Sequence, residues 1–474
     1  MIKNININKY FCIFICSAPL YGASLYLPID SKISLEVEQM ATLTSMPTSK
    51  MPYPLAMVKQ YNTKIEQSNP ILFSKIATYL KKVDSEDFIT TENLSFGITN
   101  SNKQFDLANS HGRESDYLYL GEATFFVNKN PYIKASIEAS VFQKNDTNKI
   151  QTNNSYLSLG FDKFQIDAGY RDHYYGHFRN GGVQISNNAV NSPSITISNV
   201  TPFSFADINY EIFVSQLEST SGISYEGSSE HSGKPNLLGM HLDFHPFDGT
   251  EISFDRTFQF GGGPRTTGLK DIWEAIIDPA TKDNSSATCD TDCETGNQQA
   301  SINLKYNGKF FNQDVSLYGL YGGEDTVEHK NYKFGNVVKG LGIFLPMVDP
   351  TLSLRYEVVK FDTGWYVHHI YTNGYTNDGN VMGSWSGDIS NNNAQGGTLQ
   401  YLNVVKNYDT FRLNTTLNYF DPVVNDTTDA KEKYYNIDFG IGFGKEFMHK
   451  INLGFGQLVD GQKINFVSYK FTFN

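Results

Sequence analysis

The sequence predicts an all-β transmembrane barrel of about 18 antiparallel strands, preceded by a small N-terminal α-helical bundle in the periplasm. Three observations predict this fold class. The chain starts like an exported protein without a later apolar helix, most of it has a two-residue apolar period, and its polar breaks alternate between long and short. The length of 474 residues alone would suggest two or three soluble domains, although all-β barrels can be this long as single domains. An aromatic share of 14% accompanies this length.

Residues 1–23 are expected to be a signal peptide. Lys3 and Lys9 precede a short apolar core at 10–15, and the small residues Gly22 and Ala23 favour cleavage nearby. No later apolar run reaches the ~18–20 residues that a spanning helix needs. Any membrane crossing by this chain therefore has to use strands.

Residues 24–90 have a helical period and predict about three short helices. The first carries apolar residues at helical spacing in SKISLEVEQMATL. Pro54 and Pro70 each stand near a first helical position, and Asn69 is a suitable N-cap for the last helix. These residues form the predicted periplasmic bundle.

From residue 91 to residue 474 the apolar period is two. In PYIKASIEASVF and YNIDFGIGFG one face is apolar and the other is polar or glycine. A barrel strand has this pattern when lipid lies outside and water inside, although strands of a soluble β-sandwich also alternate. The length of many runs, ~9–11 residues, is the transmembrane requirement and favours the barrel.

The connections give the strand number. Nine long polar breaks alternate with eight short ones, and outer-membrane barrels have long loops outside the cell and short turns in the periplasm. This pattern predicts eighteen strands with both ends of the barrel in the periplasm. The long breaks fall near 100–116, 144–153, 171–192, 218–236, 261–299, 323–336, 362–397, 420–432 and 458–462.

Two further segments carry structural expectations. Cys289 and Cys293 in TCDTDCETG are expected to form a small disulfide loop in an exported protein, with free thiols as the alternative. A metal site is less favoured there, because two sulfurs without nearby histidines are a poor ligand set. The segment DIWEAIIDP is expected to be a short helix.

The ordered segments of the chain resemble the Wzi family of capsule-assembly proteins. The resemblance covers YLPIDSKISLEVEQMATLTSMP, then SLGFDKFQIDAGYRDHYYGHFRNGGVQISNNAVNSPSITISN, and later GLKDIWEAI, LYGLYGGED and HHIYTNGYTNDGNVMGSWSGD. The chain differs from the family's central signature in having Tyr174, Tyr175 and His177 where Trp and Pro are usual. The aromatic last strand, KINFVSYKFTFN, resembles the signal that barrel-insertion machinery reads.

The resemblance implies a non-enzymatic, lectin-like protein of the bacterial outer membrane. Such a protein helps attach or organise capsular or other surface polysaccharide and contacts outer-membrane lipids. The alternative is an outer-membrane diffusion channel or transporter for small solutes. The net charge of -12 argues against nucleic acid as a partner. No nucleophile-elbow pattern and no phosphate loop is present, so neither a catalytic residue nor a cofactor is expected.

The polar stretch RDHYYGHFRNGG raises one metal hypothesis. His173 and His177 have the i, i+4 spacing of metal ligands, but this spacing matters only on a helix, and the stretch leaves a strand and enters a glycine pair. We therefore expect no metal and interpret 171–192 as a plug or a polysaccharide-contact loop.

Aromatic rings stack on sugar rings, and acids, amides and arginines pair with hydroxyls or uronates. The alternative is that these aromatic side chains form the interfacial girdle or fill the lumen. The candidate polysaccharide-binding residues are Arg171, Tyr174, Tyr175, Arg179, Trp365, Tyr371, Tyr375, Trp385 and Asp388.

Overall fold

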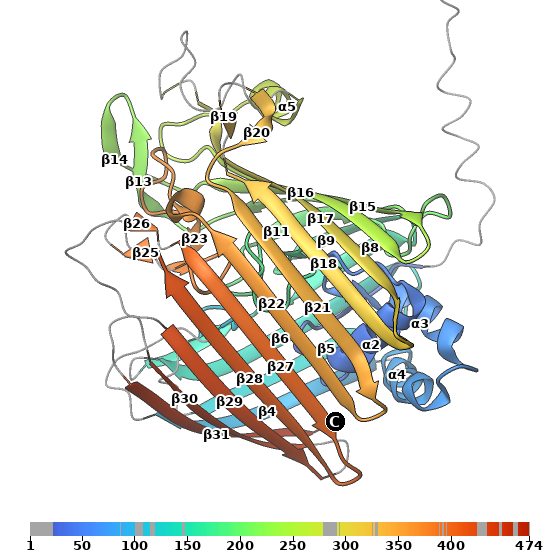
Figure 1. Ribbon diagram of the computed structural model, residues 1–474. Helices are drawn as coiled ribbons and strands as arrows, with labels where there is room; N and C mark the ends of the chain where they lie inside the picture. Colours follow the sequence, from blue (N-terminus) through green and yellow to red (C-terminus); the bar gives the residue numbers. More distant parts are fainter. Residues whose placement is uncertain are drawn as a thin grey trace, which may run out of the picture.

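The structure is a computed structural model (Figure 1). It describes residues 22–85, 87–99, 108–113, 119–144, 147–277, 292, 294–324, 326–327, 330–387, 389–390, 393–394, 396–423, 434–444, 448–457 and 463–473. Almost all of the expected signal peptide, together with Cys289, Cys293 and Asp388, lies outside these residues.

The wall is a closed barrel of 18 antiparallel strands with one extra strand, as the alternating breaks predicted. The last strand pairs with the first, from Phe466 opposite Thr99 to Phe473 opposite Glu92, and closes the cylinder. The wall strands are β4 (Asp87–Thr99), β5 (Tyr119–Val127), β6 (Ile133–Lys144), β8 (Tyr156–Phe161), β9 (Phe164–Gly169), β11 (Ser194–Ser198), β12 (Asn209–Gln216), β15 (Asn236–Phe247), β16 (Thr250–Phe260), β17 (Gly296–Phe310), β18 (Gln313–Gly323), β21 (Val338–Asp349), β22 (Leu352–Phe361), β27 (Gly397–Asn407), β28 (Phe411–Pro422), β29 (Tyr434–Phe443), β30 (His449–Gln457) and β31 (Lys463–Phe473). The extra strand, β7 (Thr147–Gln151), pairs with the end of β6.

The two faces of the wall have opposite chemistry. Along β6, Ile137 and Val141 are exposed on the outside, while Ser136 and Glu138 are buried inside. Strand β12 repeats the pattern, with Ile212 and Val214 outside and alternate residues inside. Successive side chains of a strand point to opposite faces, so an apolar outer band and a polar lumen follow from the two-residue period.

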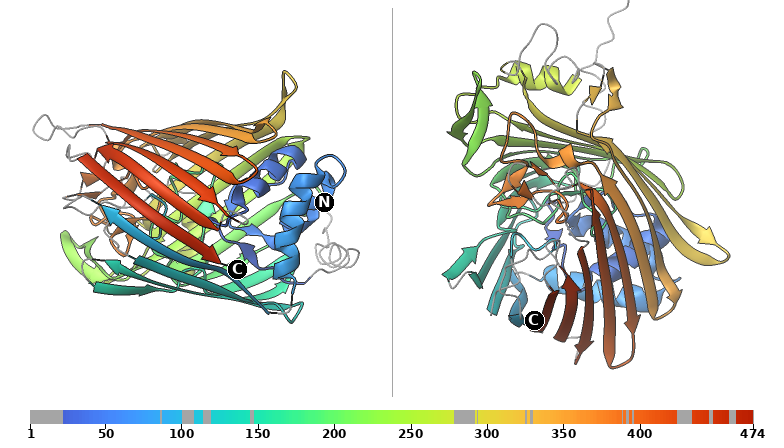
Figure 2. Two further views of the ribbon diagram at one scale, coloured as in Figure 1. Left: turned by 90° about the horizontal axis from the view of Figure 1, so that it is seen from below. Right: turned by 60° about the vertical axis from the view of Figure 1, so that its left-hand side comes forward.

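Helices occupy the mouth at which the strands are joined by short turns, which we call the short-turn end (Figures 1 and 2). Gln39 Nε2 donates to the Pro346 carbonyl near the end of a strand at 2.7 Å, and Asn128 Nδ2, in one of these turns, donates to the Val83 carbonyl at 2.7 Å. As predicted, Asn69 caps the last helix, accepting from the Leu72 amide at 3.2 Å. The helices are α2 (Ser34–Thr44), α3 (Leu55–Asn62), η1 (Thr63–Ile65) and α4 (Pro70–Val83).

No helix in the described part of the chain has the length and apolar character needed to cross a membrane.

Short strands connect the helices to other parts of the chain. They are β1 (Tyr26–Leu27), which pairs with β3 (Tyr53–Pro54), and β2 (Lys50–Met51), which pairs with β10 (Tyr174–Tyr175).

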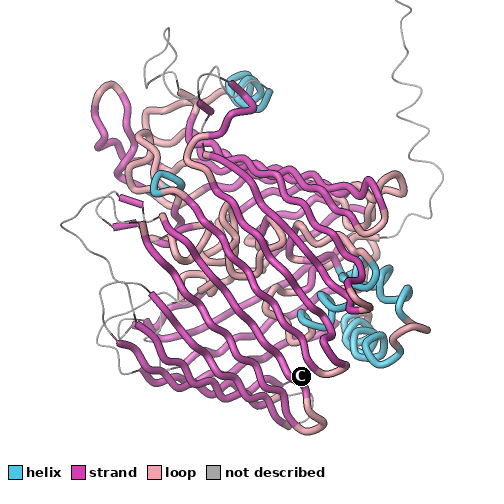
Figure 3. Tube along the Cα trace, in the orientation of Figure 1, coloured by secondary structure: helices cyan, strands magenta, loops and turns pink. Residues whose placement is uncertain are grey.

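The opposite mouth, which we call the long-loop end, carries the longer connections. They contain the hairpin β13 (Thr220–Tyr225)–β14 (Ser228–Gly233), the helix α5 (Leu269–Ile277), β19 (Thr326–Val327), β20 (Lys330–Phe334), η3 (Thr363–Tyr366), β23 (Thr376–Asn377), β24 (Asn380–Val381), β25 (Ile389–Ser390) and β26 (Asn393–Ala394). Loop segments also run inside the cylinder of strands (Figure 3).

Gly239 provides a test of packing between wall and lumen. A Cβ built on Gly239 lies 2.0 Å from Cε1 of Phe213, whose ring stacks on His173 with centroids 3.7 Å apart. We expect Gly239→Ala to lower the free energy of unfolding by about 1–3 kcal/mol, because the ring has to move in a packed environment. Gly121→Ala is the matched control, since its Cβ meets nothing within 4 Å. Thermal unfolding measures both, and equal midpoints would contradict the prediction.

Candidate functional site

The lumen is filled by the chain between β9 and β11, which we call the plug (residues 170–193). Ser194 pairs with Gly169 and Ser198 with Gln165, so the wall continues directly from β9 to β11 and the plug is an excursion from it. Almost every residue from 171 to 189 is buried. The polar stretch that suggested a plug or a contact loop is therefore a plug.

Glu211, on the inner face of β12, holds the start of the plug. Its carboxylate pairs with the Arg171 guanidinium and accepts from His173 Nδ1 at 2.9 Å and from the Tyr175 hydroxyl at 3.3 Å. Arg171 also lies 3.2 Å from Asp167 on β9. Charge-assisted bonds of this kind are about twice as strong as neutral ones, so one buried acid fixes three plug side chains.

Glu357, on the inner face of β22, holds the middle of the plug. Its carboxylate accepts from the backbone amides of Arg179 at 2.8 Å and of Asn180 at 3.1 Å, and from the Tyr318 hydroxyl at 2.8 Å. A buried loop otherwise leaves backbone donors without acceptors. Here the wall supplies the acceptor.

Arg179 connects the plug to the helical bundle. Its guanidinium lies 2.7 Å from Glu38 of α2 and also donates to the Tyr53 hydroxyl, while Arg355 of β22 pairs with the other oxygen of Glu38. Burial alone would raise the pKa of Glu38, but Arg179 and Arg355 together hold it below its ordinary value. Helix, plug and wall thus meet at one ionised carboxylate.

His177 is buried at the same junction. Its Nδ1 lies 3.3 Å from the Thr48 hydroxyl, and Thr48 receives a hydrogen bond from Lys305 at 2.5 Å. Burial lowers the pKa of His177 to about 3, with further lowering by Lys305 and Arg179 and opposition from Glu251. A small cavity of about 20 Å³ is lined by Thr48, His177 and Lys305, among other residues.

The connection after β22, residues 362–387, covers the plug at the long-loop end, and we call it the roof. Trp365 Nε1 and the Tyr366 hydroxyl both donate to the Val183 carbonyl, at 3.0 and 2.7 Å. The Tyr371 hydroxyl donates to the Gly261 carbonyl at 2.9 Å. The roof is therefore bound to the plug and to a neighbouring loop through its aromatic residues.

The structure places most of the predicted polysaccharide-binding side chains in the interior. Trp385 is partly exposed and packs against the cluster that contains Trp365 and Tyr375. Arg179 is partly exposed as well. The buried candidates, all at most 3% exposed, are Arg171, Tyr174, Tyr175, Trp365, Tyr371 and Tyr375. Contact of any of these residues with polysaccharide stays a prediction.

Ser194, His173 and Glu211 have the connectivity of a hydrolytic triad. Ser194 Oγ lies 3.2 Å from His173 Nε2, and His173 Nδ1 lies 2.9 Å from Glu211. The serine is buried, and its hydroxyl also donates to the Gly169 carbonyl at 3.3 Å. A nucleophile has to reach an acyl group, whereas this serine faces the packed plug. We therefore interpret Ser194, His173 and Glu211 as hydrogen-bonding partners that hold the plug against the wall.

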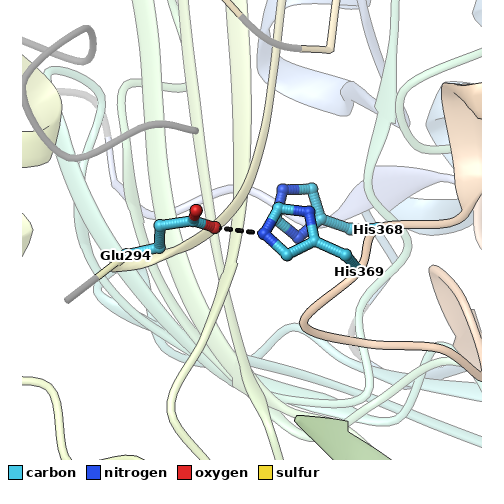
Figure 4. Close-up of side chains that lie close together, drawn as sticks. All are labelled: Glu294, His368 and His369. Carbon is cyan, nitrogen blue, oxygen red and sulfur yellow. Dashed lines mark hydrogen bonds and ion pairs between the residues drawn. The ribbon is translucent and has the colours of Figure 1, made fainter. Parts of the chain in front are cut away.

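Within the residues that the structure describes, two groups of side chains could hold a metal ion: Asp243, His245 and Glu251, and Glu294, His368 and His369 (Figure 4). In the second group, His369 Nε2 already pairs with Glu294 at 2.5 Å. In the first group, Glu251 accepts from the backbone amides of Thr48 and Ser49. Both groups thus contain acids that bond to protein donors. His173 and His177 belong to neither.

The wall acids that hold the plug, and the one that holds Thr48 and Ser49 beside it, were missed from the sequence. Glu211, Glu251 and Glu357 each occupy an inward position of an alternating strand, in NYEIFVSQ, TEISFD and RYEVVKF. An acid flanked by apolar residues in a transmembrane strand was a usable signal, because an ionisable group there needs a partner in the lumen.

A model of the family described as capsule assembly protein Wzi matches residues 89–452. The chain belongs to the Wzi family. A solved structure of Wzi, described as an outer membrane protein involved in group 1 capsule assembly in Escherichia coli and as a carbohydrate-binding β-barrel, is 15% identical with a TM-score of 0.70. The match covers 96% of this chain and 100% of the chain in the solved structure.

This Wzi-family chain shares the closed antiparallel β-barrel fold of that structure. A triple mutant of the Rhodopseudomonas blastica porin is 9% identical and covers 82% of this chain and 100% of that chain, with a TM-score of only 0.37. A comparison with curated proteins found no match.

Removal of the Glu357 carboxylate is expected to loosen the plug. In Glu357→Ala the amides of Arg179 and Asn180 lose their acceptor, and a buried unsatisfied donor costs about 1–3 kcal/mol. We expect hydrogen exchange of these two amides to accelerate about a hundredfold, which corresponds to ~3 kcal/mol. Lys360→Ala, on the exposed face of the same strand, is the control. Equal exchange in both variants would refute the role of Glu357.

Acid is expected to destabilise the protein partly through His177. Its folded pKa of about 3 lies below the ordinary 6.5, so its contribution is complete above pH 6.5 and is lost as the pH falls towards 3. At pH 5 the loss is about 2 kcal/mol. The fall in thermal midpoint between pH 7.5 and pH 5 should be smaller in His177→Gln than in the unmodified protein. Identical falls would show that His177 does not contribute.

Proposed function

We propose that the protein binds surface polysaccharide at the long-loop end of the barrel and helps attach or organise it as a capsule-assembly factor. The observation that carries this proposal is the match over nearly the whole chain to a Wzi that is described as carbohydrate-binding. On this proposal the long-loop end faces the outside of the cell, the helical bundle lies in the periplasm, and the protein acts without catalysis.

The packing of the lumen favours this function over a diffusion channel. A channel needs a continuous aqueous path, whereas the plug is fixed by Glu211 and Glu357 and covered by the roof. A large polymer that cannot enter the lumen can then bind only to the surface, and the long-loop end is the surface that we propose for it. A large, stable conductance of the purified protein in planar bilayers would instead support the channel.

The roof divides its side chains between two roles. Its aromatic residues are buried except for the partly exposed Trp385, while Asn373 and Asp378 are exposed. We assign polysaccharide contact to these polar residues and to Trp385 and Asp388, because amides and acids pair with hydroxyl groups and aromatic rings stack on sugars. The buried candidates, including Tyr174 and Trp365, position the roof and the plug.

The other expectations from the sequence belong to the same proposal. Residues 1–23 are removed as a signal peptide, residues 24–90 form the periplasmic domain, and residues 91–474 form the barrel. The barrel-insertion machinery reads the last strand, and Cys289 pairs with Cys293. These features describe an exported protein that is assembled into the outer membrane and contacts its lipids.

The proposal predicts which polysaccharide stays on the cell. Deletion of the gene should lower the cell-bound fraction and raise the released fraction. Complementation with the double variant Asn373→Ala, Asp378→Gly should restore little of the cell-bound fraction of polysaccharide, because each lost hydrogen bond weakens binding by about 1 kcal/mol. Glycine suits position 378, whose φ is 50°.

The matched control makes the same chemical changes near the short-turn end: Asn130→Ala, beside a turn, and Asp207→Gly, at a φ of 46°. This control should restore the cell-bound fraction fully. An unchanged cell-bound fraction after gene deletion would end the attachment proposal. Full restoration by the roof variant would instead remove Asn373 and Asp378 from the binding surface.

A further inference from the structure

Helix α5 lies against the outside of the barrel wall. Its Ala275 is fully buried, and Ile272 and Ile276 pack with Leu238 and Phe258. The alternate residues of the same strands, such as Leu237 and Gln259, are buried on the lumen side. Leu238 and Phe258 therefore face outward, and α5 covers them near the long-loop ends of β15 and β16 (Figure 1).

Arg256 fixes the C-terminal end of α5 at a defined depth on the wall. Its guanidinium donates to the carbonyls of Ile276 at 2.8 Å and Ala275 at 2.6 Å, and it also contacts Gln298 of β17. A cation at the carbonyl end of a helix is the favourable arrangement. Arg256 and Gln298 are thus outward-facing polar residues that are covered by the helix.

The next outward-facing residues along the wall are apolar and exposed. Leu242 pairs with Phe254, and Phe254 pairs with Ile302 on the neighbouring strand. Their exposed fractions are 44%, 45% and 41%. These three residues belong to the exposed apolar outer face of the wall, which in a membrane barrel faces lipid. Arg256 and Phe254 are successive outward-facing residues of β16, so the C-terminal end of α5 lies next to this lipid-facing row.

A second face of α5 is apolar and exposed. Leu269, Trp273 and Ile277 have exposed fractions of 87%, 62% and 61%. They are four residues apart, so they form one stripe beside the face that packs on the wall. Lys270 and Glu274 form an ion pair on the other side of this stripe. The helix thus has a wall face, an apolar stripe and a charged face in turn around its axis.

We propose that α5 is a membrane-surface helix whose stripe of Leu269, Trp273 and Ile277 inserts among the acyl chains of the outer leaflet. The stripe is continuous with the lipid-facing band of the wall, which identifies lipid as its occupant. A helix in this corner directs one apolar face to the wall, the other to the membrane and its charges to water. Tryptophan is the residue that favours this interface.

The fluorescence of Trp273 tests the proposal in the full-length protein. The chain has 3 tryptophans, and Trp365 is buried, so the difference between the unmodified protein and Trp273→Phe isolates the signal of Trp273. Reconstitution uses vesicles of phosphatidylcholine with brominated acyl chains and, in parallel, unbrominated ones. We expect bromine to quench the Trp273 component at least twofold and aqueous acrylamide to quench it little.

Control variants separate contact with lipid from exposure to water and from loss of folding. A tryptophan placed at exposed Ser228 of the β14 hairpin, in the Trp273→Phe background, should be quenched by acrylamide and not by bromine. Leu269→Ser with Ile277→Ser should reduce bromine quenching of Trp273, whereas Lys270→Ser with Glu274→Ser should not. Each variant is first shown to unfold at the same temperature as the parent protein.

Quenching of Trp273 by acrylamide and not by bromine would overturn the proposal. Protection that depends on protein concentration would indicate a second copy of the chain, and protection that appears only on addition of polysaccharide would indicate a glycan contact. Both outcomes would also overturn it. The vesicles contain no polysaccharide, so the result does not depend on the proposed binding function.

Discussion

An eighteen-strand wall encloses more space than its own inward side chains can fill, and the rest of the structure follows from the way this space is occupied. Barrels of this size otherwise hold an aqueous channel. Here a segment of chain enters the lumen, and its backbone groups need partners away from bulk water. Carboxylates on the inner face of the wall provide them, as Glu357 does for two successive amides.

Opposite charges select one arrangement of the plug. Arg171 is bound between Asp167 and Glu211, and Arg179 lies beside Glu38. A buried ion pair adds little net stability because both groups lose their hydration, but separation of the partners is costly. The pairs therefore exclude other positions of the plug more than they strengthen the barrel. Glu38 belongs to α2, so the same pairs also fix the helical bundle against the plug.

The fold could be predicted from the sequence, whereas the interior of the candidate site could not. The two-residue period and the alternation of breaks are local signals, and they were sufficient for the strand number and for the early helices. The plug depends on contacts between distant residues, such as the Arg179 amide and Glu357, which are 178 positions apart. Local composition shows that Trp365 and Tyr375 are aromatic and lie in a polar loop. It does not show that the loop folds inward and buries them.

Because β9 pairs directly with β11, the closure of the wall does not depend on what fills the lumen. The wall has a complete ladder of hydrogen bonds without the plug, since Gly169 already faces Ser194. Natural selection can therefore lengthen, shorten or re-charge the plug while the cylinder is inherited unchanged. An open barrel and a plugged barrel of this architecture differ by one segment of chain between two wall strands. Divergence in the lumen should consequently outpace divergence in strand order among descendants of a common barrel.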